Sequence, residues 1–363
     1  MGLDGRALQG SRTGVGRYVF ELCKELDRQL PSATFFVYSN VPVELPISSA
    51  RWVLRVDPSK WASKMKSVLW LKLRCGALCE RDNLDVFWGS AVFLPVLPEK
   101  VRTAITVYDL TYKIVPRTMG VTHRWAFRLF FKNDLLRSDS VLAISKGTSD
   151  RLFKLYGRAA DAIVYPAVNN CFKRQSEEFV QQILSQYSLT NPYLLAVATL
   201  EPRKNLELLI RTFLDMKRRG LLCEHKLVLV GGRGWKDRRL VELIAGASSV
   251  IPLGYISDAS LAPLYSGAEA FIFPSLYEGF GIPILEAIAC ETKVVTSDIP
   301  ELREAGRGDA IYIDPTAAGI EEGVLQVLTQ SARKNGVDIS RQPSWKQEAK
   351  KLTSALLGQS AIE

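Results

Sequence analysis

The stretch 271–298, FIFPSLYEGFGIPILEAIACETKVVTSD, decides the fold. It opens in a short and almost fully apolar run, 270–273, which is typical of a strand buried on both faces of a parallel sheet. Pro283 suits the beginning of a helix, where a missing N–H costs nothing. Apolar residues then recur at helical spacing to 289, and a second apolar run begins at Lys293. The stretch therefore predicts a strand, a loop, a helix and a second strand.

The loop of this unit has the composition of a ligand site. Its residues Glu278-Gly279-Phe280-Gly281 combine a carboxylate with two glycines, which let the backbone approach a ligand closely. The N–H groups at a helix start favour anionic oxygens. Glu286, expected in the first helical turn, adds a second carboxylate that could grip hydroxyls. These groups suggest a binding site for a phosphate next to a sugar. The same residues would also be found in a tight strand-to-helix turn without a ligand, in which Glu286 only complements the helix dipole.

The rest of the chain repeats the same alternation. Its 363 residues, 47% of them apolar, are enough for two domains with a core each. Strands and helices alternate in both halves, which predicts doubly wound parallel sheets of the α/β class. The polar segment 171–191 has no strand signal and marks the boundary. We therefore predict an N-terminal domain at 1–170 and a C-terminal domain at 171–343, with a capped helix in 344–363 packing back across the junction.

Charge is distributed unevenly between the halves. Residues 1–170 contain 25 Lys and Arg against 15 Asp and Glu, whereas residues 171–363 contain 22 against 23. The basic half should face something anionic, and a solvated basic face is the alternative. Between Lys60 and Arg74, five cations alternate with tryptophan and aliphatic residues. Such a helix can lie in a membrane interface. The sequence is equally compatible with a helix that packs against the sheet and exposes its basic side to solvent.

Targeting and cysteine signals are sparse. We find no apolar run of transmembrane length and no basic-then-apolar signal segment. Six cysteines are scattered without CxxC spacing, which argues against a zinc site and favours reduced thiols in a cytoplasmic protein. Gly2-Leu3-Asp4 reads as the end of a strand, so we expect that the sequence could begin within that strand.

Further candidate ligand groups follow other strands. Gly14 and Gly16 open the first long helix in a glycine-rich loop suited to a phosphate, although the pattern is not GxGxxG and a dinucleotide site is weakly supported. Tyr108 and Asp109 end a strand, where open α/β sheets place their ligands. Arg203 and Lys204 stand at or just before a helix N-terminus, where cations are unfavourable unless an anion lies between them.

These motifs together resemble the retaining glycosyltransferases of family four, which have the GT-B architecture of two Rossmann-like domains facing a central cleft. The resemblance covers nearly the whole chain and points to mannosyl- or rhamnosyltransferase-like members. It rests on five motifs, at 13–18, 107–110, 143–145, 201–205 and 275–286.

The resemblance implies a role for each candidate residue. A nucleotide-diphosphate sugar, most simply a GDP-sugar, would be the donor, with no metal and no other cofactor. Arg203 and Lys204 would hold its diphosphate, with Lys204 counted as catalytic, and Glu278 would lie at the transferred sugar. The remaining expected contacts are Gly14 and Gly16 closing on the diphosphate, Tyr255 at the base, Phe280, Gly281 and Ile282 at the helix start, and Glu286 at the ribose.

Two departures from the family pattern matter. Tyr108 stands where the family has His, and tyrosine is a poor base near neutral pH, so its catalytic role next to Asp109 is open. After Cys290 the family has Gly-x-Pro, and this chain has Glu291-Thr292-Lys293, which should affect stability more than chemistry.

The resemblance implies transfer to a glycan or lipid-diphosphate-linked acceptor in O-antigen or surface polysaccharide synthesis. We expect a cytoplasmic enzyme held peripherally at the inner membrane, with no nucleic-acid partner. A sugar-nucleotide epimerase of the same fold is an alternative, which would need proton-transferring groups in a chain with two histidines. A non-catalytic subunit is the other, although the candidate residues Arg203, Lys204, Glu278 and Glu286 argue against it.

Overall fold

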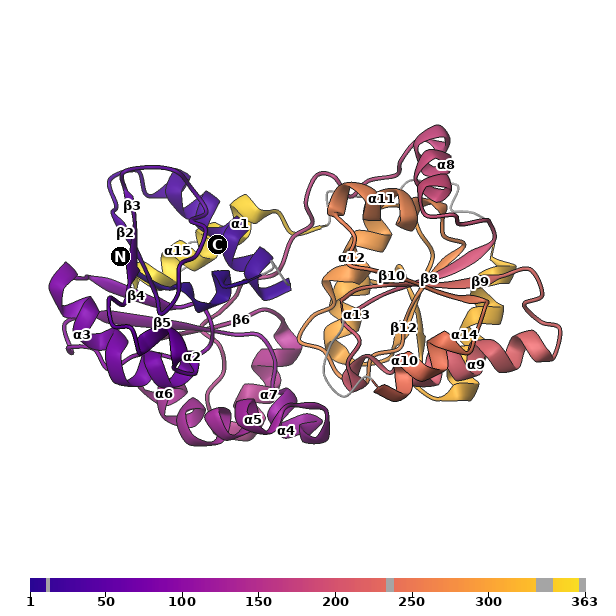
Figure 1. Ribbon diagram of the computed structural model, residues 1–363. Coiled ribbons are helices and arrows are strands. Elements are labelled where there is room, and N and C mark those ends of the chain that lie inside the picture. The colour runs from indigo at the N-terminus through magenta and orange to yellow at the C-terminus, as the bar shows by residue number, and fades with distance from the viewer. Residues whose placement is uncertain (11–13, 233–237, 331–341, 359–363) are drawn as a thin grey trace. The chain divides into compact units, whose positions relative to one another are not determined.

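The computed structural model describes residues 1–10, 14–232, 238–330 and 342–358 (Figure 1). The chain divides into two compact units. The first unit contains residues 1–112, 121–167 and 343–363, and the second contains residues 113–120 and 168–342. Each unit is built around its own parallel sheet.

The first unit has a seven-stranded sheet within the described residues, in the order β3-β2-β1-β4-β5-β6-β7, and all its pairings are parallel. Its strands are β1 Gly2–Asp4, β2 Phe35–Ser39, β3 Trp52–Val56, β4 Val86–Gly89, β5 Arg102–Val107, β6 Ser140–Ala143 and β7 Ala162–Ile163. The chain runs outward from β1 on one side and from β4 on the other, so the order reverses between β1 and β4.

Helices connect these strands. The α-helices are α1 Gly14–Gln29, α2 Ser67–Trp70, α3 Gly76–Cys79, α4 Thr111–Ile114, α5 Val121–Ala126, α6 Lys132–Arg137, α7 Lys146–Tyr156 and α15 Trp345–Leu357. Short 3-10 helices are η1 Gly5–Leu8, η2 Ala62–Lys64 and η4 Glu80–Asp82, and two π-helical turns are η3 Leu71–Cys75 and η6 Phe127–Phe131. The 3-10 helix η5 Pro116–Thr118 lies between β5 and β6 in the chain but belongs to the second unit.

In the part of the second unit that the structure describes, six strands form a parallel sheet in the order β10-β9-β8-β11-β12-β13. Its strands are β8 Tyr193–Val197, β9 Lys226–Val230, β10 Val250–Gly254, β11 Ala270–Phe273, β12 Val294–Ser297 and β13 Ile311–Ile313. Its helices are α8 Glu177–Gln186, η7 Pro202–Lys204, α9 Leu206–Arg218, α10 Arg238–Ala245, α11 Asp258–Gly267, α12 Ile282–Ala289, α13 Pro300–Gly306 and α14 Ala317–Thr329. Here the order reverses between β8 and β11.

The stretch that opened the sequence analysis folds as predicted. All four residues of β11 are buried, as expected for a central strand covered on both faces. Gly281 caps α12 with a φ of 111°, and an added Cβ would lie 2.7 Å from Leu302 Cδ2, so the position needs glycine. The apolar face of α9 packs on the same side of the sheet as α14, in a core that includes Leu194, Ile210, Phe213, Leu227, Ile272, Val295, Ile320 and Val324.

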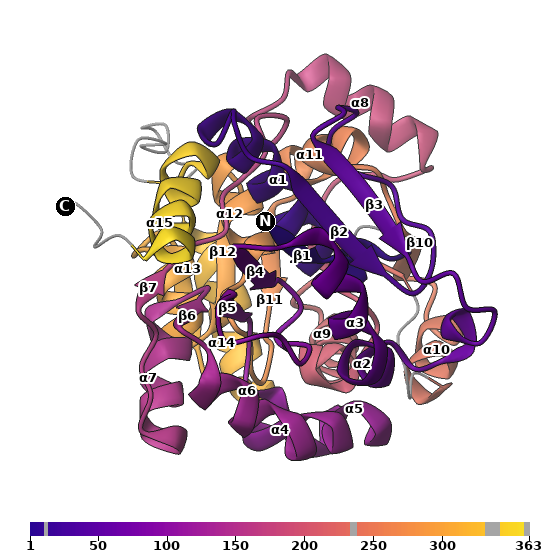
Figure 2. The same ribbon diagram turned by 90° about the vertical axis from the view of Figure 1, so that its left-hand side faces the viewer.

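The C-terminal helix belongs to the first unit. Figures 1 and 2 show α15 next to α1, and these helices contact each other along their length. The Ser344 hydroxyl accepts a hydrogen bond from the Gln347 N–H at 3.3 Å, which confirms the predicted helix start. The helical segment 121–137 is not one regular α-helix, because the π-helical turn η6 separates α5 from α6.

The predicted α/β fold of two doubly wound parallel sheets is therefore confirmed. No helix in the described residues is long and apolar enough to cross a membrane.

Candidate functional site

The best candidate site lies in the second unit, at the carboxyl ends of β8 and β11. These neighbouring strands flank the point where the strand order reverses. Loops that follow such strands diverge to opposite faces of the sheet and leave a crevice, in which open α/β proteins bind their ligands. The loop after β8 carries Arg203 and Lys204, and the loop after β11 carries Glu278.

The structure brings these three side chains together. Arg203 Nη1 lies 2.5 Å from Glu278 Oε2, and Lys204 Nζ lies 2.6 Å from Glu278 Oε1. Their side chains are 13%, 12% and 8% exposed for Arg203, Lys204 and Glu278 respectively. Two cations thus share one nearly buried carboxylate, and each carboxylate oxygen pairs with one of them.

Arg203 is held by further contacts. Its Nη1 donates to the Tyr277 carbonyl oxygen at 2.9 Å, and its Nη2 lies 3.3 Å from Glu201 Oε1. The backbone N–H of Leu276 donates to the Arg203 carbonyl oxygen at 2.9 Å. These bonds tie the loop after β8 to the loop after β11, so the cationic groups have little freedom to move apart.

The pKa shifts show which charge is incompletely compensated. Burial raises the pKa of Glu278, but the charges of Arg203 and Lys204 outweigh burial and lower it to about 2, so Glu278 is ionised at neutral pH. Burial, followed by the charge of Arg203, lowers the pKa of Lys204, and Glu278 offsets only part of this. A second anion near Lys204 would therefore stabilise its charged form.

The start of α12 adds a helix dipole to the same edge. Glu278, Gly279, Phe280 and Gly281 are all buried, and α12 begins at Ile282 directly after them. The N-terminal end of a helix carries roughly half a positive charge. The loop therefore places a helix terminus next to the side chain of Glu278 and the cations bound to it.

Glu286 lies one position farther into its helix than predicted. It is the fifth residue of α12 rather than part of the first turn, which contains no acidic residue. The side chain is buried, and its Oε2 accepts a hydrogen bond from the Tyr265 hydroxyl of α11 at 3.1 Å. The reason for the difference is that the helix begins at Ile282, one residue before Pro283. A buried carboxylate oriented by a tyrosine is suited to binding hydroxyl groups.

Two neighbouring glycines connect the loops of this edge and were not identified from the sequence. Gly231 follows β9, donates its N–H to the Gly254 carbonyl at 2.8 Å, and would bring a Cβ to 2.0 Å from the Ala198 carbonyl oxygen. Gly232 accepts from the Leu200 N–H at 3.1 Å. Only glycine fits at position 231, because the backbone there lies too close to Ala198 for a side chain. The Gly-Gly pair directly after an apolar strand was the available signal.

The predicted base contact lies farther along the same edge. Tyr255 follows β10, which is separated from β8 by β9, and its side chain is 69% exposed. The structure thus places Tyr255 on the same edge of the sheet as Arg203 and Glu278, and the Gly231–Gly254 hydrogen bond links its loop to that of β9.

The predicted residues of the first unit also lie at the carboxyl edge of their own sheet. Gly14 is the first residue of α1, and an added Cβ at Gly16 would lie 2.8 Å from the Ala7 carbonyl oxygen. The preceding residues 11–13 of the predicted loop lie outside the described residues. Gly16 therefore allows the close approach of α1 to η1.

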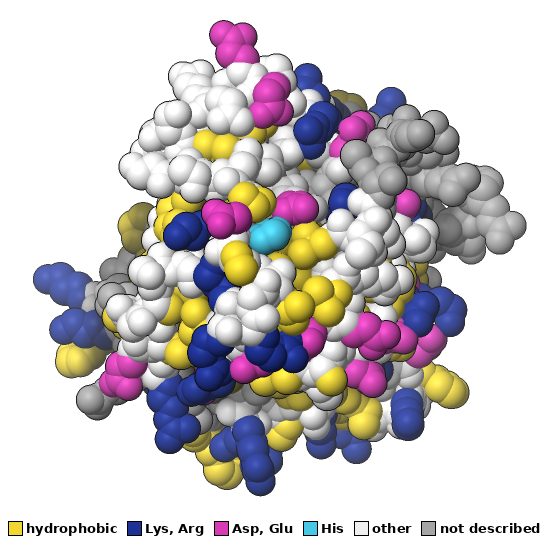
Figure 3. Space-filling model, turned by 90° about the vertical axis from the view of Figure 1, so that its right-hand side faces the viewer, with side chains coloured by type: hydrophobic (Ala, Val, Ile, Leu, Met, Phe, Trp, Pro, Cys, Tyr) yellow, Lys and Arg dark blue, Asp and Glu magenta, His cyan; other side chains and the backbone are white. Residues whose placement is uncertain are grey.

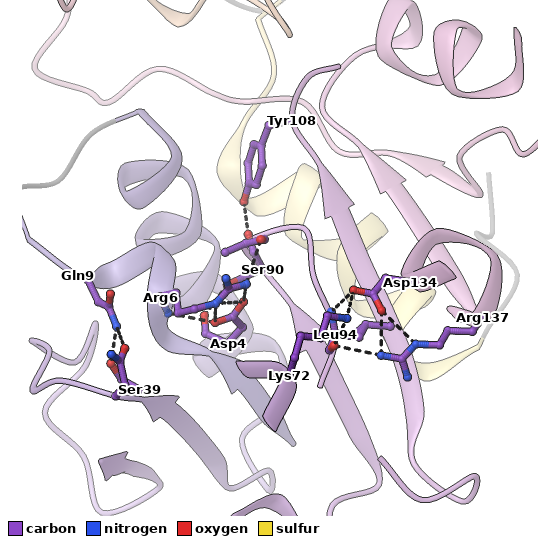
Figure 4. A network of polar contacts seen from close by, with 12 residues as sticks. Asp4, Arg6, Gln9, Ser39, Lys72, Ser90, Leu94, Tyr108, Asp134 and Arg137 are labelled. Carbon is purple, nitrogen blue, oxygen red and sulfur yellow. Dashed lines mark hydrogen bonds and ion pairs between the residues drawn. The ribbon is translucent and has the colours of Figure 1, made fainter. Parts of the chain in front are cut away.

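Tyr108 is buried at this edge, and Figure 4 shows its side chain directed toward Ser90. Its hydroxyl donates to the Ser90 carbonyl at 2.6 Å, and burial raises its pKa well above the ordinary value. Ser90 Oγ in turn donates to the Asp4 carbonyl at 2.6 Å. Tyr108 is thus a connecting group between the strand ends and is not suited to accept a proton. Asp109 Oδ1 accepts from the Thr111 N–H at 2.9 Å, which orders the following turn.

Comparison with known proteins agrees with this geometry. Residues 191–330, which span the sheet of the second unit and its helices from η7 to α14, match the family described as glycosyl transferases group 1. The O-antigen chain mannosyltransferase B of Escherichia coli is 28% identical over 363 residues, covering 92% of this chain and 93% of that relative.

Two further similarities are informative. The serotype-specific mannosyltransferase WbdA of Escherichia coli is 31% identical over 219 residues, which are 57% of this chain but 27% of WbdA. The solved structure of Anabaena Alr3699/HepE in complex with UDP and glucose shares the fold, with a TM-score of 0.68, 16% identity and coverage of 98% of both chains.

The fold and the comparisons define the class of protein. Residues 191–330 match the group 1 glycosyltransferases, and the chain has the GT-B fold. It is a glycosyltransferase, and its homologues include O-antigen mannosyltransferases.

Proposed function

We propose that this enzyme transfers a mannose- or rhamnose-type hexose from a nucleotide-diphosphate sugar, with GDP favoured, to a glycan or lipid-diphosphate-linked acceptor in O-antigen synthesis. The observation that carries the proposal is the buried Arg203–Glu278–Lys204 cluster at the β8–β11 edge. The mannosyltransferase relatives support the sugar and the pathway.

In this proposal the donor diphosphate binds to Arg203 and Lys204. Phosphate oxygens form charge-assisted bonds of roughly 1.5–3 kcal/mol each with such groups. Because Lys204 has a lowered pKa, it gains most from the arrival of an anion. As the phosphate takes over the cations, the carboxylate of Glu278 is released to hydrogen-bond hydroxyls of the transferred sugar.

The remaining nucleotide contacts follow from the same edge. Glu286, oriented by Tyr265, would accept hydrogen bonds from the ribose hydroxyls, and Tyr255 would lie against the base. The helix start at Gly281 and Ile282, with the Phe280 backbone, would stabilise negative charge on the leaving diphosphate.

For the chemical step we propose transfer with retention of configuration and without a metal ion. The bond between the anomeric carbon and the diphosphate oxygen breaks as the acceptor oxygen bonds to the same face, and the acceptor proton moves to the leaving diphosphate. Stabilisation of the leaving charge by Arg203 and Lys204 is then the main contribution of the protein.

We further propose that acceptors are carried on lipid diphosphates at the inner membrane, where the enzyme binds peripherally. The excess of basic residues in the N-terminal half supports this location, because anionic lipid headgroups attract Lys and Arg.

The proposal is tested by incubating the purified protein with a panel of nucleotide sugars and an O-antigen acceptor in the presence of EDTA. We expect a GDP-sugar to be consumed and the product linkage to have the anomeric configuration of the donor by NMR. A product of inverted configuration, loss of transfer on chelation, or epimerised sugar formed without acceptor would contradict the respective part of the proposal.

A further inference from the structure

Two helical segments of the first unit are apolar on their outer as well as their inner sides. The first is α2–η3–α3 (67–79) and the second is α5–η6–α6 (121–137). Inward, Trp70, Leu71 and Phe131 have no exposed surface. Outward, Leu73 is 67% exposed and Leu129 is 64% exposed. Apolar side chains on both sides of a surface helix require an explanation, since one apolar stripe is enough to bury it.

The outward residues of the second segment form a stripe. Val121, Trp125 and Leu129 recur at a spacing of four and are 57%, 54% and 64% exposed, and Leu136 is 53% exposed. In each segment a π-helical turn adds one residue to the turn, at Leu71–Cys75 and at Phe127–Phe131. An added residue shifts the phase of the helix, and π-helical turns are found frequently at functional sites.

The two segments are fastened side by side. The Lys72 ammonium of η3 forms an ion pair with Asp134 of α6, donates to the Leu94 carbonyl at 2.8 Å, and lies 5.2 Å from the centroid of the Phe130 ring. Arg137 Nη2 lies 3.0 Å from the same carboxylate of Asp134 (Figure 4). Figures 1 and 2 both show α2 and α6 at the same end of the first unit.

Lys72 therefore has a structural role. Burial lowers its pKa, and Asp134 compensates in part. Lys72 is therefore not counted among the cations of segment 60–74 that could contact a membrane. Arg74 is not counted either, because its Nε lies 2.6 Å from Asp57 Oδ2. The cations available at the surface are instead Lys60, Lys64 and Lys66 near α2 and Arg128 and Lys132 in the second segment, all of which are exposed.

The exposed surface of both segments lacks acidic side chains, since Asp134 of the second segment is buried and paired with Lys72 and Arg137. Residues 58–79 contain five Lys and Arg and no Asp or Glu, and residues 121–133 contain three and none. Exposed aromatic residues accompany the cations: Arg128 lies 5.9 Å from the Trp125 ring and Lys64 lies 5.6 Å from the Trp61 ring. By contrast, the face in Figure 3 carries basic and acidic side chains interspersed.

We propose that these segments form the surface by which the enzyme docks on an anionic lipid bilayer. We define the two-helix surface by the exposed side chains of Leu69, Leu73, Trp125, Arg128, Leu129 and Lys132. Amphipathic helices bind such membranes through apolar side chains at the headgroup boundary and cations toward anionic headgroups. The inference rests on the membrane-linked acceptor proposed above and names the residues that would bring the enzyme to it.

The first test is co-sedimentation with vesicles, without donor or acceptor. We expect the protein to bind phosphatidylcholine vesicles that contain phosphatidylglycerol, and to bind pure phosphatidylcholine weakly. Arg128→Gln/Lys132→Gln should weaken binding to the anionic vesicles by about tenfold or more at low salt. Lys346→Gln/Lys350→Gln on α15 removes the same charge from exposed positions and should bind like the unchanged protein. Equal binding by both double variants would overturn the proposal.

The second test separates insertion from charge attraction. Trp125→Ser/Leu129→Ser should abolish most of the binding, whereas Leu221→Ser, at a residue that is 43% exposed in the second unit, should not. Acyl-brominated lipids should quench tryptophan fluorescence less in Trp125→Phe than in the unchanged protein. Thermal unfolding confirms that each variant is folded.

Two outcomes distinguish this proposal from others. If Trp125→Ser/Leu129→Ser changes the sedimentation coefficient but not vesicle binding, the surface joins copies of this chain and the lipid proposal is wrong. If the protein binds vesicles as expected but transfers no sugar to a detergent-dispersed acceptor, the proposed enzymatic function is wrong and the docking surface stands.

Discussion

The two sheets of this protein place a buried Arg–carboxylate contact at equivalent positions, with different consequences. In the first unit, Arg6 follows β1 and pairs with Asp4, the two side chains being 5% and 0% exposed. In the second, Arg203 follows β8 and pairs with Glu278. Both positions lie where the strand order reverses, which is the usual ligand-binding position of such sheets.

The difference lies in how the charges are balanced. Arg6 donates from Nε and Nη2 to Asp4, and from Nη2 to the Ala91 carbonyl at 3.1 Å, so one cation meets one carboxylate. Glu278 instead serves both Arg203 and Lys204, and the lowered pKa of Lys204 shows that its charge is undercompensated. Topology thus provides two equivalent edges, and the charge balance makes one of them structural and the other a candidate anion site.

The largest expected effect is on the folding of the first unit. Arg6→Ala leaves Asp4 buried without its cation, which should reduce the free energy of unfolding by about 3–5 kcal/mol. Urea denaturation measures this change. Arg28→Ala, which breaks an exposed pair with Glu25, is the control and should cost at most about 1 kcal/mol. A small effect of Arg6→Ala would place Arg6 among ligand-binding rather than structural groups.

The second prediction concerns the equivalent edge of the second unit. Lys204→Ala and Glu278→Ala should each lower the rate of sugar transfer on the order of a hundredfold or more, because each removes a group that meets developing charge. Lys204→Ala should leave the unfolding midpoint near that of the unchanged protein, since Arg203 still pairs with Glu278. Arg211→Ala on α9 serves as the control. Unchanged turnover in both variants refutes the assigned site.

The third prediction uses the pKa of Glu278. Its pKa in the folded protein is lowered from 4.5 to about 2, so its contribution to stability is complete above 4.5 and is lost as the pH falls toward 2. The difference in unfolding free energy between the unchanged protein and Glu278→Gln should therefore be constant near neutral pH and shrink over this acidic range. A difference that instead changes between about pH 6 and 8 would contradict the ion pairing.

The fourth prediction tests whether Tyr265 orients Glu286. Tyr265→Phe removes the hydroxyl that donates to Glu286 and should weaken nucleotide binding by roughly five- to tenfold. The loss should be smaller for a nucleotide that lacks the ribose hydroxyls, because Glu286 then has no partner to bind. Calorimetry with both nucleotides measures this. Equal losses would indicate a general structural role for Tyr265.

The smallest expected effect is at the turn after α12. Glu291 has a φ of 61°, in the left-handed region that non-glycine residues disfavour. Glu291→Gly should raise the free energy of unfolding by about 0.5–1 kcal/mol, with transfer unchanged. Thermal denaturation and a transfer assay check both parts. Arg307, with a φ of 48° at the end of α13, offers a matched second site.

Local patterns were sufficient for much of the candidate site. The strand, loop and helix around Gly281 follow from an apolar run, two glycines and a proline, and the structure has them as predicted. Glu286 falls just outside the first turn because α12 begins at Ile282, one residue before the proline that was expected to open it. Gly231 was missed because its requirement for glycine comes from the Ala198 carbonyl, 33 residues earlier in the chain.

The basic segment shows the same limit more clearly. Its sequence indicates cations and tryptophans near Lys60–Arg74 but not which of them reach the surface. The structure buries Trp70 and pairs Lys72 with Asp134, a residue far along the chain. The exposed stripe around Trp125 was not identified from the sequence, because periodicity alone does not tell the inner side of a helix from the outer.

The sequence by itself determined the alternation of strands and helices, the loops between them and the residue types of the anion site, since these depend on spacing and composition within short stretches. Only the tertiary structure decided that Arg203 and Lys204 share Glu278, that Tyr108 is engaged by Ser90, and that Lys72 is structural. Those outcomes depend on which distant groups meet in a low-dielectric interior, where the balance of desolvation and pairing sets each role.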